Sequence, residues 1–137
     1  MLRPVATRPL LPVLVTCALA GCGGDRPSDE QQIRSTLAEF ERATAVGDYR
    51  TLCGRVLAPQ LIRSVTETGL TCELALQKGI EGVEEDPHLT VGTITVDDDR
   101  ATAEVRTSAA GQAPSQDTLE LVRLGDGWRI ASLAGGS

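Results

Sequence analysis

Residues 89–107 have the sequence LTVGTITVDDDRATAEVRT, in which apolar and polar residues alternate. A period of two is typical of half-buried β-strands, whose successive side chains point to opposite faces. The stretch therefore predicts two strands, with an irregularity near Gly92 and a turn at residues 97–100. The side chains expected on one face of the returning strand are those of Ala101, Ala103, Val105 and Thr107.

A second pair of strands is predicted after a loop of small residues at 109–116. The third strand alternates between one face and the other, with Leu119, Leu121 and Arg123 opposite Val122 and Leu124. The Gly-Asp-Gly sequence at 125–127 is a strong hairpin signal. In the last strand the alternating residues are Trp128, Ile130 and Ser132. Together these segments predict an antiparallel sheet of about four strands.

The segment before these strands has helical signals. Ser28 and Gln31 fit a capping box, in which each side chain accepts from the other residue's backbone N–H. An apolar face then recurs at helical spacing, through Ile33, Leu37, Phe40 and Ala43 or Thr44. Gly47 is expected to end this helix, because a left-handed residue is common there.

Three shorter helices are predicted to follow. Asp48 can cap a helix from Tyr49 to about Leu57, with Leu52, Cys53 and Val56 facing inward. The next helices are expected from Pro59 through Val65 and, capped by Thr71, from Cys72 to Lys78, with Gly79, Gly82 and Pro87 ending helical structure. Helices followed by antiparallel strands indicate an α+β fold, with the helices on one face of a curved sheet.

The first residues are predicted to be a targeting signal. Arg3 and Arg8 precede the uncharged run 10–20, which is too short to span a bilayer but suits a signal peptide. Leu19-Ala20-Gly21-Cys22 resembles the lipobox of bacterial lipoproteins. That resemblance implies cleavage after residue 21, a diacylglyceryl group on Cys22, and attachment to the extracytoplasmic face of the cell membrane. The predicted divisions are a signal peptide at 1–21, an acylated tether at 22–27 and a folded domain at 28–134.

Two other processing routes are open. Ala18-Leu19-Ala20 also fits an ordinary signal peptidase, which would release a soluble protein. Cys17 is a second thiol for acylation, although Thr16 suits the position before it poorly. If Cys22 carries two acyl chains, they contribute on the order of 20 kcal/mol of membrane affinity, and the tether spans less than roughly 20 Å. The domain is then expected to work close to the membrane.

The order of these elements resembles the NTF2-like superfamily, whose members have a cone-shaped α+β fold. The likeness rests on the long first helix, Gly47-Asp48-Tyr49, Cys53, Cys72 and the closing Gly125-Asp126-Gly127-Trp128-Arg129-Ile130. The likeness covers residues 28–133. More narrowly, the chain resembles small actinobacterial lipoproteins of that superfamily. Enzymes of the superfamily place Asp, His or Tyr in the cone pocket, whereas the inward positions here are mostly Val, Ala, Ile, Leu and Thr.

Cys53 and Cys72 are an even pair in a chain predicted to be exported, which predicts a disulfide. A disulfide between these cysteines, which are 19 positions apart, stabilises the folded state by about 3 kcal/mol in the chain-entropy model. A redox role lacks a Cys-x-x-Cys motif and an adjacent base. A metal site would have to combine two thiols with one remote histidine. The predicted role is therefore a structural disulfide, and no cofactor or metal is expected.

The charge and aromatic content argue against a nucleic-acid partner. The chain has 137 residues, with 13 Lys and Arg against 19 Asp and Glu, and its only aromatic residues are one Phe, one Tyr and one Trp. Nucleic-acid binding requires clustered basic residues or stacking platforms. Asp97-Asp98-Asp99 also lacks the Gly and distal Glu of a calcium loop, so a solvated hairpin tip is expected there.

The function favoured by these features is a non-catalytic, membrane-anchored domain that binds a partner protein or a small apolar ligand at the open end of its cone. The alternative is a small hydrolyase or isomerase using His88 with Glu85 or Asp86. That reading requires the groups to converge with Tyr49 or Trp128 on one cavity. A third hypothesis is an accessory subunit of a membrane complex, which would show an exposed apolar patch on the sheet.

Overall fold

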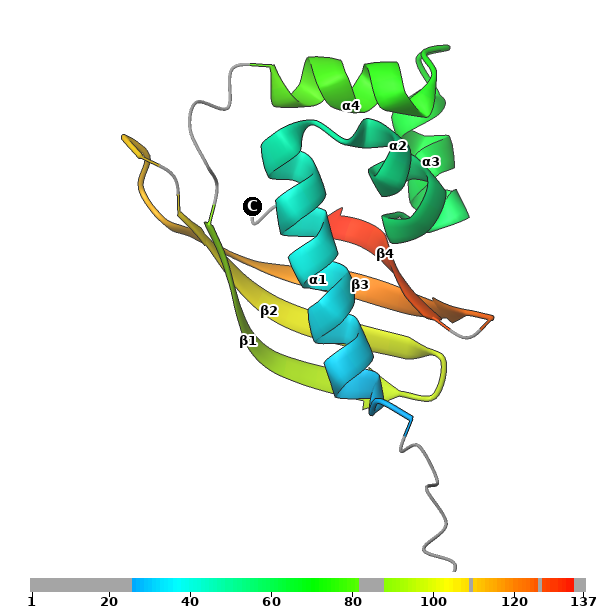
Figure 1. The fold of residues 1–137 in the computed structure, drawn as a ribbon, viewed down its shortest axis with the longest axis vertical. Helices are drawn as coiled ribbons and strands as arrows, with labels where there is room; N and C mark the ends of the chain where they lie inside the picture. The colour runs from blue at the N-terminus through cyan, green and yellow to red at the C-terminus, as the bar shows by residue number, and fades with distance from the viewer. Residues whose placement is uncertain (1–25, 82–87, 109, 126, 135–137) are drawn as a thin grey trace, which may run out of the picture.

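The computed structural model describes residues 26–81, 88–108, 110–125 and 127–134. Its helical part contains α1 (Asp29–Val46), α2 (Tyr49–Thr51), the π-helix η1 (Leu52–Val56), α3 (Pro59–Thr66) and α4 (Cys72–Ile80). The strands are β1 (His88–Asp97), β2 (Arg100–Ser108), β3 (Ser115–Leu124) and β4 (Gly127–Ala134). Figure 1 shows α1 crossing the sheet and the shorter helices gathered beside β4 and the end of α1.

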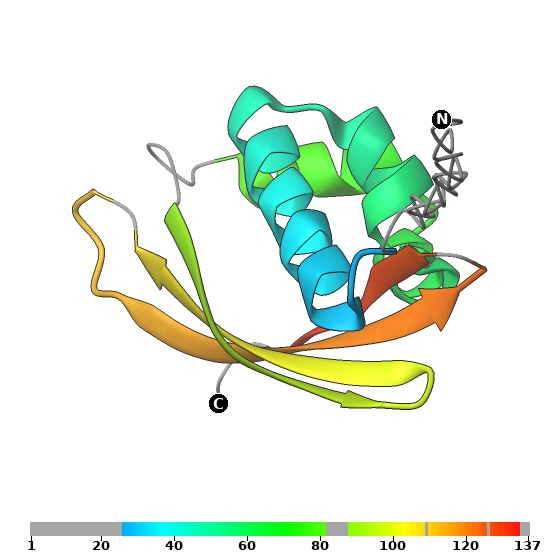
Figure 2. The same ribbon diagram turned by 60° about the horizontal axis from the view of Figure 1, so that its bottom comes forward.

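The four strands form one antiparallel sheet in the order β1-β2-β3-β4. The sheet is strongly curved, and the helices lie on its concave side (Figure 2). The predicted fold class, an α+β cone with helices on a curved antiparallel sheet, is therefore confirmed. The predicted signal, Cys22, Glu85 and Asp86 lie outside the described residues, as do Gly82 and Pro87.

The ends of α1 follow the local sequence signals. The Ser28 Oγ accepts from the Gln31 N–H, and the Gln31 side chain accepts from the Ser28 N–H at 2.9 Å, which completes the predicted capping box. Gly47 ends the helix with φ at 68°, a left-handed conformation that glycine adopts without strain. Asp48 then caps α2 by accepting from the Thr51 N–H.

Three predicted boundaries were wrong. The helix expected from Tyr49 to Leu57 changes after Thr51 into η1, where the Leu57 N–H donates to the Leu52 carbonyl five residues earlier. Gly79 lies inside α4, which continues to Ile80, because an isolated glycine weakens a helix without ending it. The third strand begins at Ser115, within the predicted loop, because pairing with Thr107 of β2 extends it.

The predicted alternation in β4 holds at its start and then fails. Trp128 and Ile130 are buried, as predicted. The register then shifts between Glu120 and Leu121 of β3, so that Ala131 is passed over. Ser132 consequently pairs with Glu120 on the outer face, and Leu133 pairs with Leu119 on the inner face. The bulge predicted near Gly92 is present, between Val91 and Ile94.

The core lies between α1, η1 and the concave face of the sheet. Trp128 and the inner-face residues of β2 pack there against the apolar face of α1. The largest fully buried side chains are those of Ile33, Leu37, Leu52, Val56, Leu57, Leu121 and Ile130. Burial of this kind contributes about 25 cal/mol per Å² of apolar surface and fixes the sheet's inner face toward the helices.

Both edges of the sheet have partners. On the β4 side, Leu57 forms a parallel bridge with Ile130, and the Ala58 N–H donates to the Ile130 carbonyl at 2.7 Å. On the β1 side, Arg34 of α1 donates to the carbonyls of the bulge at Val91 and Gly92. Glu41, two turns further along α1, accepts from the Leu89 N–H at 3.0 Å. These contacts satisfy edge groups that would otherwise invite pairing with another chain.

Candidate functional site

A small cavity of about 230 Å³ lies on the concave side of the sheet. Its walls come from α1 and all four strands. They are formed by Phe40, Leu89, Val105, Thr107, Asp117, Leu119 and Leu133. Five of these seven side chains are apolar, and Leu133, which is 44% exposed, marks the opening. Ligand pockets usually measure roughly 300–1,000 Å³, so this one suits only a small molecule.

Strand register explains how these residues meet. Leu89 pairs with Thr107, Val105 with Asp117, and Leu119 with Leu133, so three cross-strand pairs share the inner face. Phe40 continues the apolar face of α1 beyond Ile33 and Leu37 and packs, partly buried, against the core. The cavity therefore lies beside the core, because Val105 and Leu119 belong both to its wall and to the core.

Asp117 is the charged group in the cavity wall. It is half-buried, and its Oδ2 accepts from the Ser115 hydroxyl at 3.0 Å. Asp117 lies on the inner face of β3 with Leu119 and Leu121. Once the strand is known to start at Ser115, its alternation predicts that the Asp117 side chain points to this face. The sequence analysis missed both Asp117 and Leu133, the first because it was placed next to a loop and the second because of the β4 bulge.

The structure describes only part of the proposed acid–base group, because Glu85 and Asp86 lie outside the described residues. The His88 side chain is 81% exposed, and its Nδ1 lies 3.5 Å from Glu41 on the surface. Tyr49 packs beside Gly47 at the far end of α1, and Trp128 is buried next to its start. Tyr49 and Trp128 therefore lie at opposite ends of α1.

Trp128 instead joins a polar cluster that fixes the start of α1. The indole Nε1 donates to Asp29 Oδ1 at 3.2 Å, and Arg123 lies 2.8 Å from Asp29 Oδ2. The Arg123 guanidinium also stacks 4.6 Å from the centre of the indole ring. The hydrogen bond from Arg123, followed by that from Trp128, lowers the pKa of Asp29 below its ordinary value.

The predicted disulfide is confirmed. Cys53 and Cys72 are bonded, with their Cα atoms 6.1 Å apart. The bond links η1, which packs on β4, to the first residue of α4. No helix in the described ranges is long and apolar enough to cross a membrane. Within those same ranges, no three His, Cys, Asp or Glu side chains are grouped as metal ligands.

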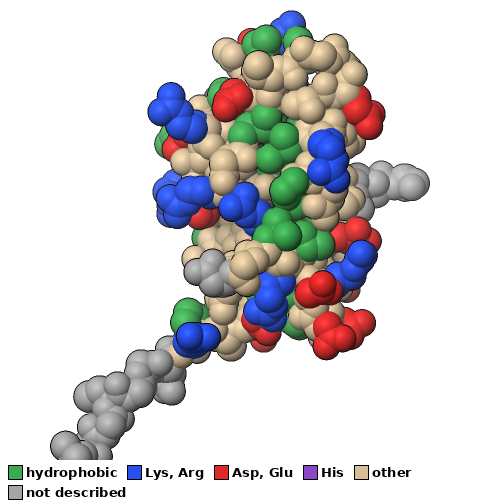
Figure 3. Space-filling model, turned by 90° about the vertical axis from the view of Figure 1, so that its right-hand side faces the viewer, with side chains coloured by type: hydrophobic (Ala, Val, Ile, Leu, Met, Phe, Trp, Pro, Cys, Tyr) green, Lys and Arg blue, Asp and Glu red, His purple; other side chains and the backbone are tan. Residues whose placement is uncertain are grey.

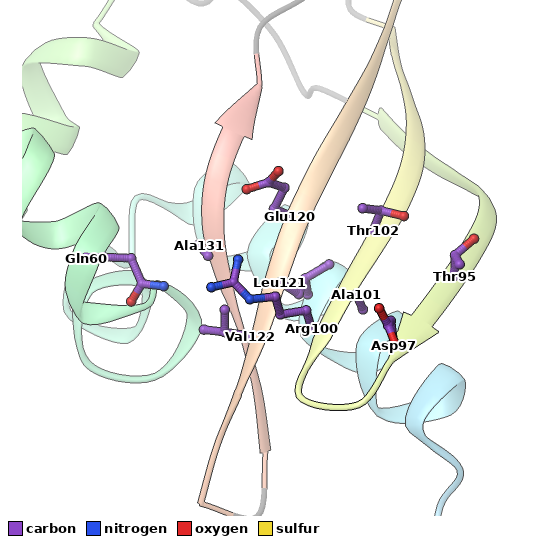
Figure 4. Close-up of a pocket in the computed structure, with 10 residues that line it drawn as sticks. All are labelled: Gln60, Thr95, Asp97, Arg100, Ala101, Thr102, Glu120, Leu121, Val122 and Ala131. Atoms are coloured by element: carbon purple, nitrogen blue, oxygen red, sulfur yellow. The ribbon is translucent and has the colours of Figure 1, made fainter.

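A second cavity of about 300 Å³ lies on the outer face of the sheet and is lined by residues of all four strands and by Gln60 of α3. Figure 4 shows Arg100 extended across β3 toward Ala131, with Glu120 above it and Gln60 of α3 to the side. Figure 3 shows hydrophobic side chains in a band down the side of the molecule. The exposed apolar residues of the described structure include Leu74 of α4 and Leu124 of β3.

Comparison with known proteins identifies solved structures with a similar architecture. Neither a protein-family model nor a curated protein matches the sequence. Among solved structures, the Kfla4162 protein of Kribbella flavida is 24% identical, covers 77% of this chain and 87% of its own, and has a TM-score of 0.53. An NTF-2 like protein of unknown function from Silicibacter pomeroyi is 19% identical, with coverages of 73% and 87% and a TM-score of 0.52.

A de novo designed NTF2 fold protein is 15% identical, with coverages of 78% of this chain and 86% of the design and a TM-score of 0.52. At these identities the likeness concerns the arrangement of helices and strands and carries no activity with it. The curved four-stranded sheet, the helices on its concave side and these neighbours together show that the chain has an NTF2-like α+β fold.

Proposed function

We propose that the protein is a lipid-anchored binding domain on the extracytoplasmic face of the cell membrane, which holds a small apolar molecule in the cavity lined by Phe40. The observation that carries the proposal is the lining itself, with apolar side chains from one helix and four strands around a single carboxylate. A pocket that is mostly apolar, with few polar groups, is the usual form of a small-molecule site.

The anchor is inferred from the lipobox at Leu19-Ala20-Gly21-Cys22. The structure is compatible with a short tether, because α1 begins at Asp29, seven residues after Cys22. Mass spectrometry of the protein isolated from membranes is expected to show a diacylated chain that begins at Cys22. An unmodified chain beginning at Gly21 would contradict the anchor, and Cys22→Ser is expected to release the domain from membranes.

Ligand binding is tested with indole, a rigid apolar probe with one N–H donor for the carboxylate of Asp117. Titration of the isotope-labelled protein should shift the NMR signals of cavity residues such as Leu89 and Leu133. Thr107→Phe, which places a ring in the cavity, is expected to abolish these shifts. The matched control is Thr118→Phe, at an exposed residue of β3 outside the cavity, which should leave binding unchanged.

The test also separates the rival occupant. If indole shifts no cavity signals at millimolar concentration, the small-molecule proposal is wrong. Shifts that survive Thr107→Phe would place the probe elsewhere and would also refute it. A partner protein that binds at the open end of the cone would, when added to the labelled protein, shift signals over the surrounding surface and leave those of the cavity interior unchanged.

A further inference from the structure

The two ends of the domain differ in a way that bears on where a ligand comes from. One end, called here the tether end, contains the start of α1, the β1–β2 turn and the β3–β4 turn. Asp29 of α1 contacts Arg123 and Trp128, which flank the β3–β4 turn. The Arg123 N–H donates in turn to the carbonyl of Asp99 in the β1–β2 turn, at 2.8 Å. These contacts fix the three segments together.

The cavity lies at the opposite end. Phe40 follows Asp29 by eleven residues of α1, which at 1.5 Å per residue is about 16 Å along the helix. Leu89 precedes Asp97 by eight residues of β1, which is about 26 Å along the strand. Figure 1 shows the same arrangement of the two ends, with the start of α1 and the β1–β2 turn at the bottom and the end of α1 at the top.

We infer that the anchored domain stands with its tether end toward the bilayer and its cavity open to the aqueous side, so that the ligand is taken from water and not drawn from the membrane. This inference rests on the lipid anchor proposed above. Only three residues lie between Cys22 and Arg26, the first described residue, and the four steps of chain from Cys22 to Arg26 span at most about 14 Å. That reach decides between the two orientations.

If the cavity faced the bilayer, the start of α1, where the tether joins the domain, would stand at least about 16 Å above it, which is the rise along α1 from Phe40 to Asp29. A 14 Å tether cannot cover that height. Asp97, Asp98 and Asp99 lie at this same end and are repelled by an anionic leaflet, so the reach of the tether, and not charge, carries the inference. The domain is therefore held near the surface by one end, and the opening at Leu133 faces away.

The orientation is measured with two fluorescent labels on the acylated full chain, purified from membranes and reconstituted into vesicles. Leu124→Cys places a thiol at the tether end, on a side chain that is 40% exposed. Val46→Cys places one at the last residue of α1, where the side chain is 73% exposed. Cys53 and Cys72 are bonded to each other, and acylation occupies Cys22, so a maleimide dye reacts with the new thiol.

Vesicles containing lipids with a nitroxide on the headgroup should quench the dye at residue 124 at least twofold more than the dye at residue 46. Equal quenching, or stronger quenching at residue 46, would overturn the inference while leaving the anchor intact. Co-flotation of protein and vesicles is measured in the same samples, with Cys22→Ser as the unanchored control. If the full chain fails to float, the anchor itself is refuted and the inference fails with it.

Discussion

Asp29 holds two different donors at once, one oxygen facing the Trp128 indole and the other the Arg123 guanidinium. Both contacts favour the ionised carboxylate, which is why they lower its pKa. A lowered folded-state pKa stabilises the fold fully above the unfolded value of about 4, and this contribution is lost as the pH falls through the folded-state pKa. The start of α1 should therefore loosen in acid.

The chain contains one tryptophan, and it is the residue that Asp29 contacts, so its fluorescence reports this titration directly. We expect the Trp128 emission to change as the pH is lowered below 4. In Asp29→Asn this acid transition should be absent, because the amide does not ionise, and the emission at neutral pH should already be altered. An unchanged transition in Asp29→Asn would show that another group controls the indole.

Two threonines on α1 allow the effect of a hydroxyl group on stability to be compared with and without a hydrogen bond. The Thr36 hydroxyl donates toward the carbonyls of Gln32 and Trp128, at 3.1 and 3.2 Å. The Thr44 Oγ1 is buried and has no hydrogen-bond partner among the described residues. Replacing a buried hydroxyl by a methyl group removes a hydrogen bond in the first case and relieves an unpaired polar atom in the second.

Thr36→Val is accordingly expected to lower the free energy of unfolding by about 1 kcal/mol, and Thr44→Val to raise it by about the same amount. Urea denaturation at neutral pH measures both. Because valine has nearly the shape of threonine, cavity effects are small and the two changes should have opposite signs. A loss of stability in Thr44→Val comparable to that in Thr36→Val would show that its hydroxyl has a partner after all.

At the scale of elements, the features that the sequence predicts correctly are those set by neighbours along the chain. The capping box of Ser28 and the left-handed Gly47 depend on residues within one turn, and both are present. The bulge in β4 depends on how residues 130–132 meet β3, which no local pattern records. The π-helix likewise ends where Leu57 pairs with Ile130, a contact made across the fold.

The disulfide acts between elements, since it joins η1 to the start of α4. The cysteines are separated by 19 residues, and a loop of this size gives about 3 kcal/mol of stabilisation by restricting the unfolded chain. The Cys53→Ser/Cys72→Ser double variant should lose about that much free energy of unfolding in urea. A reductant should destabilise the wild-type domain and leave the double variant unchanged; destabilisation of both would indicate an effect unrelated to this bond.

At the scale of the whole molecule, the candidate site could be predicted only in part. The apolar character of the inner face followed from the alternation in β2, and the position of the opening at one end of the cone followed from the fold. Asp117 and Leu133 enter the cavity through strand extension and a register shift, which are settled when all four strands are assembled. The side chain of His88, the weak catalytic candidate, faces solvent and is 81% exposed.

The length of the tether gives the last prediction, because the orientation inferred above depends on reach. A flexible Gly/Ser segment of n residues has an end-to-end distance of about 5–6 Å times the square root of n, so 20 residues add about 25 Å. Inserted between Gly24 and Asp25, such a segment should let the domain turn over and remove most of the difference in quenching between labels at residues 124 and 46. A rigid helical insert of the same length should raise the whole domain and lower the quenching of both labels. If the flexible insert leaves the difference unchanged, contacts between the tether end and the membrane hold the orientation, and the short reach of the tether does not.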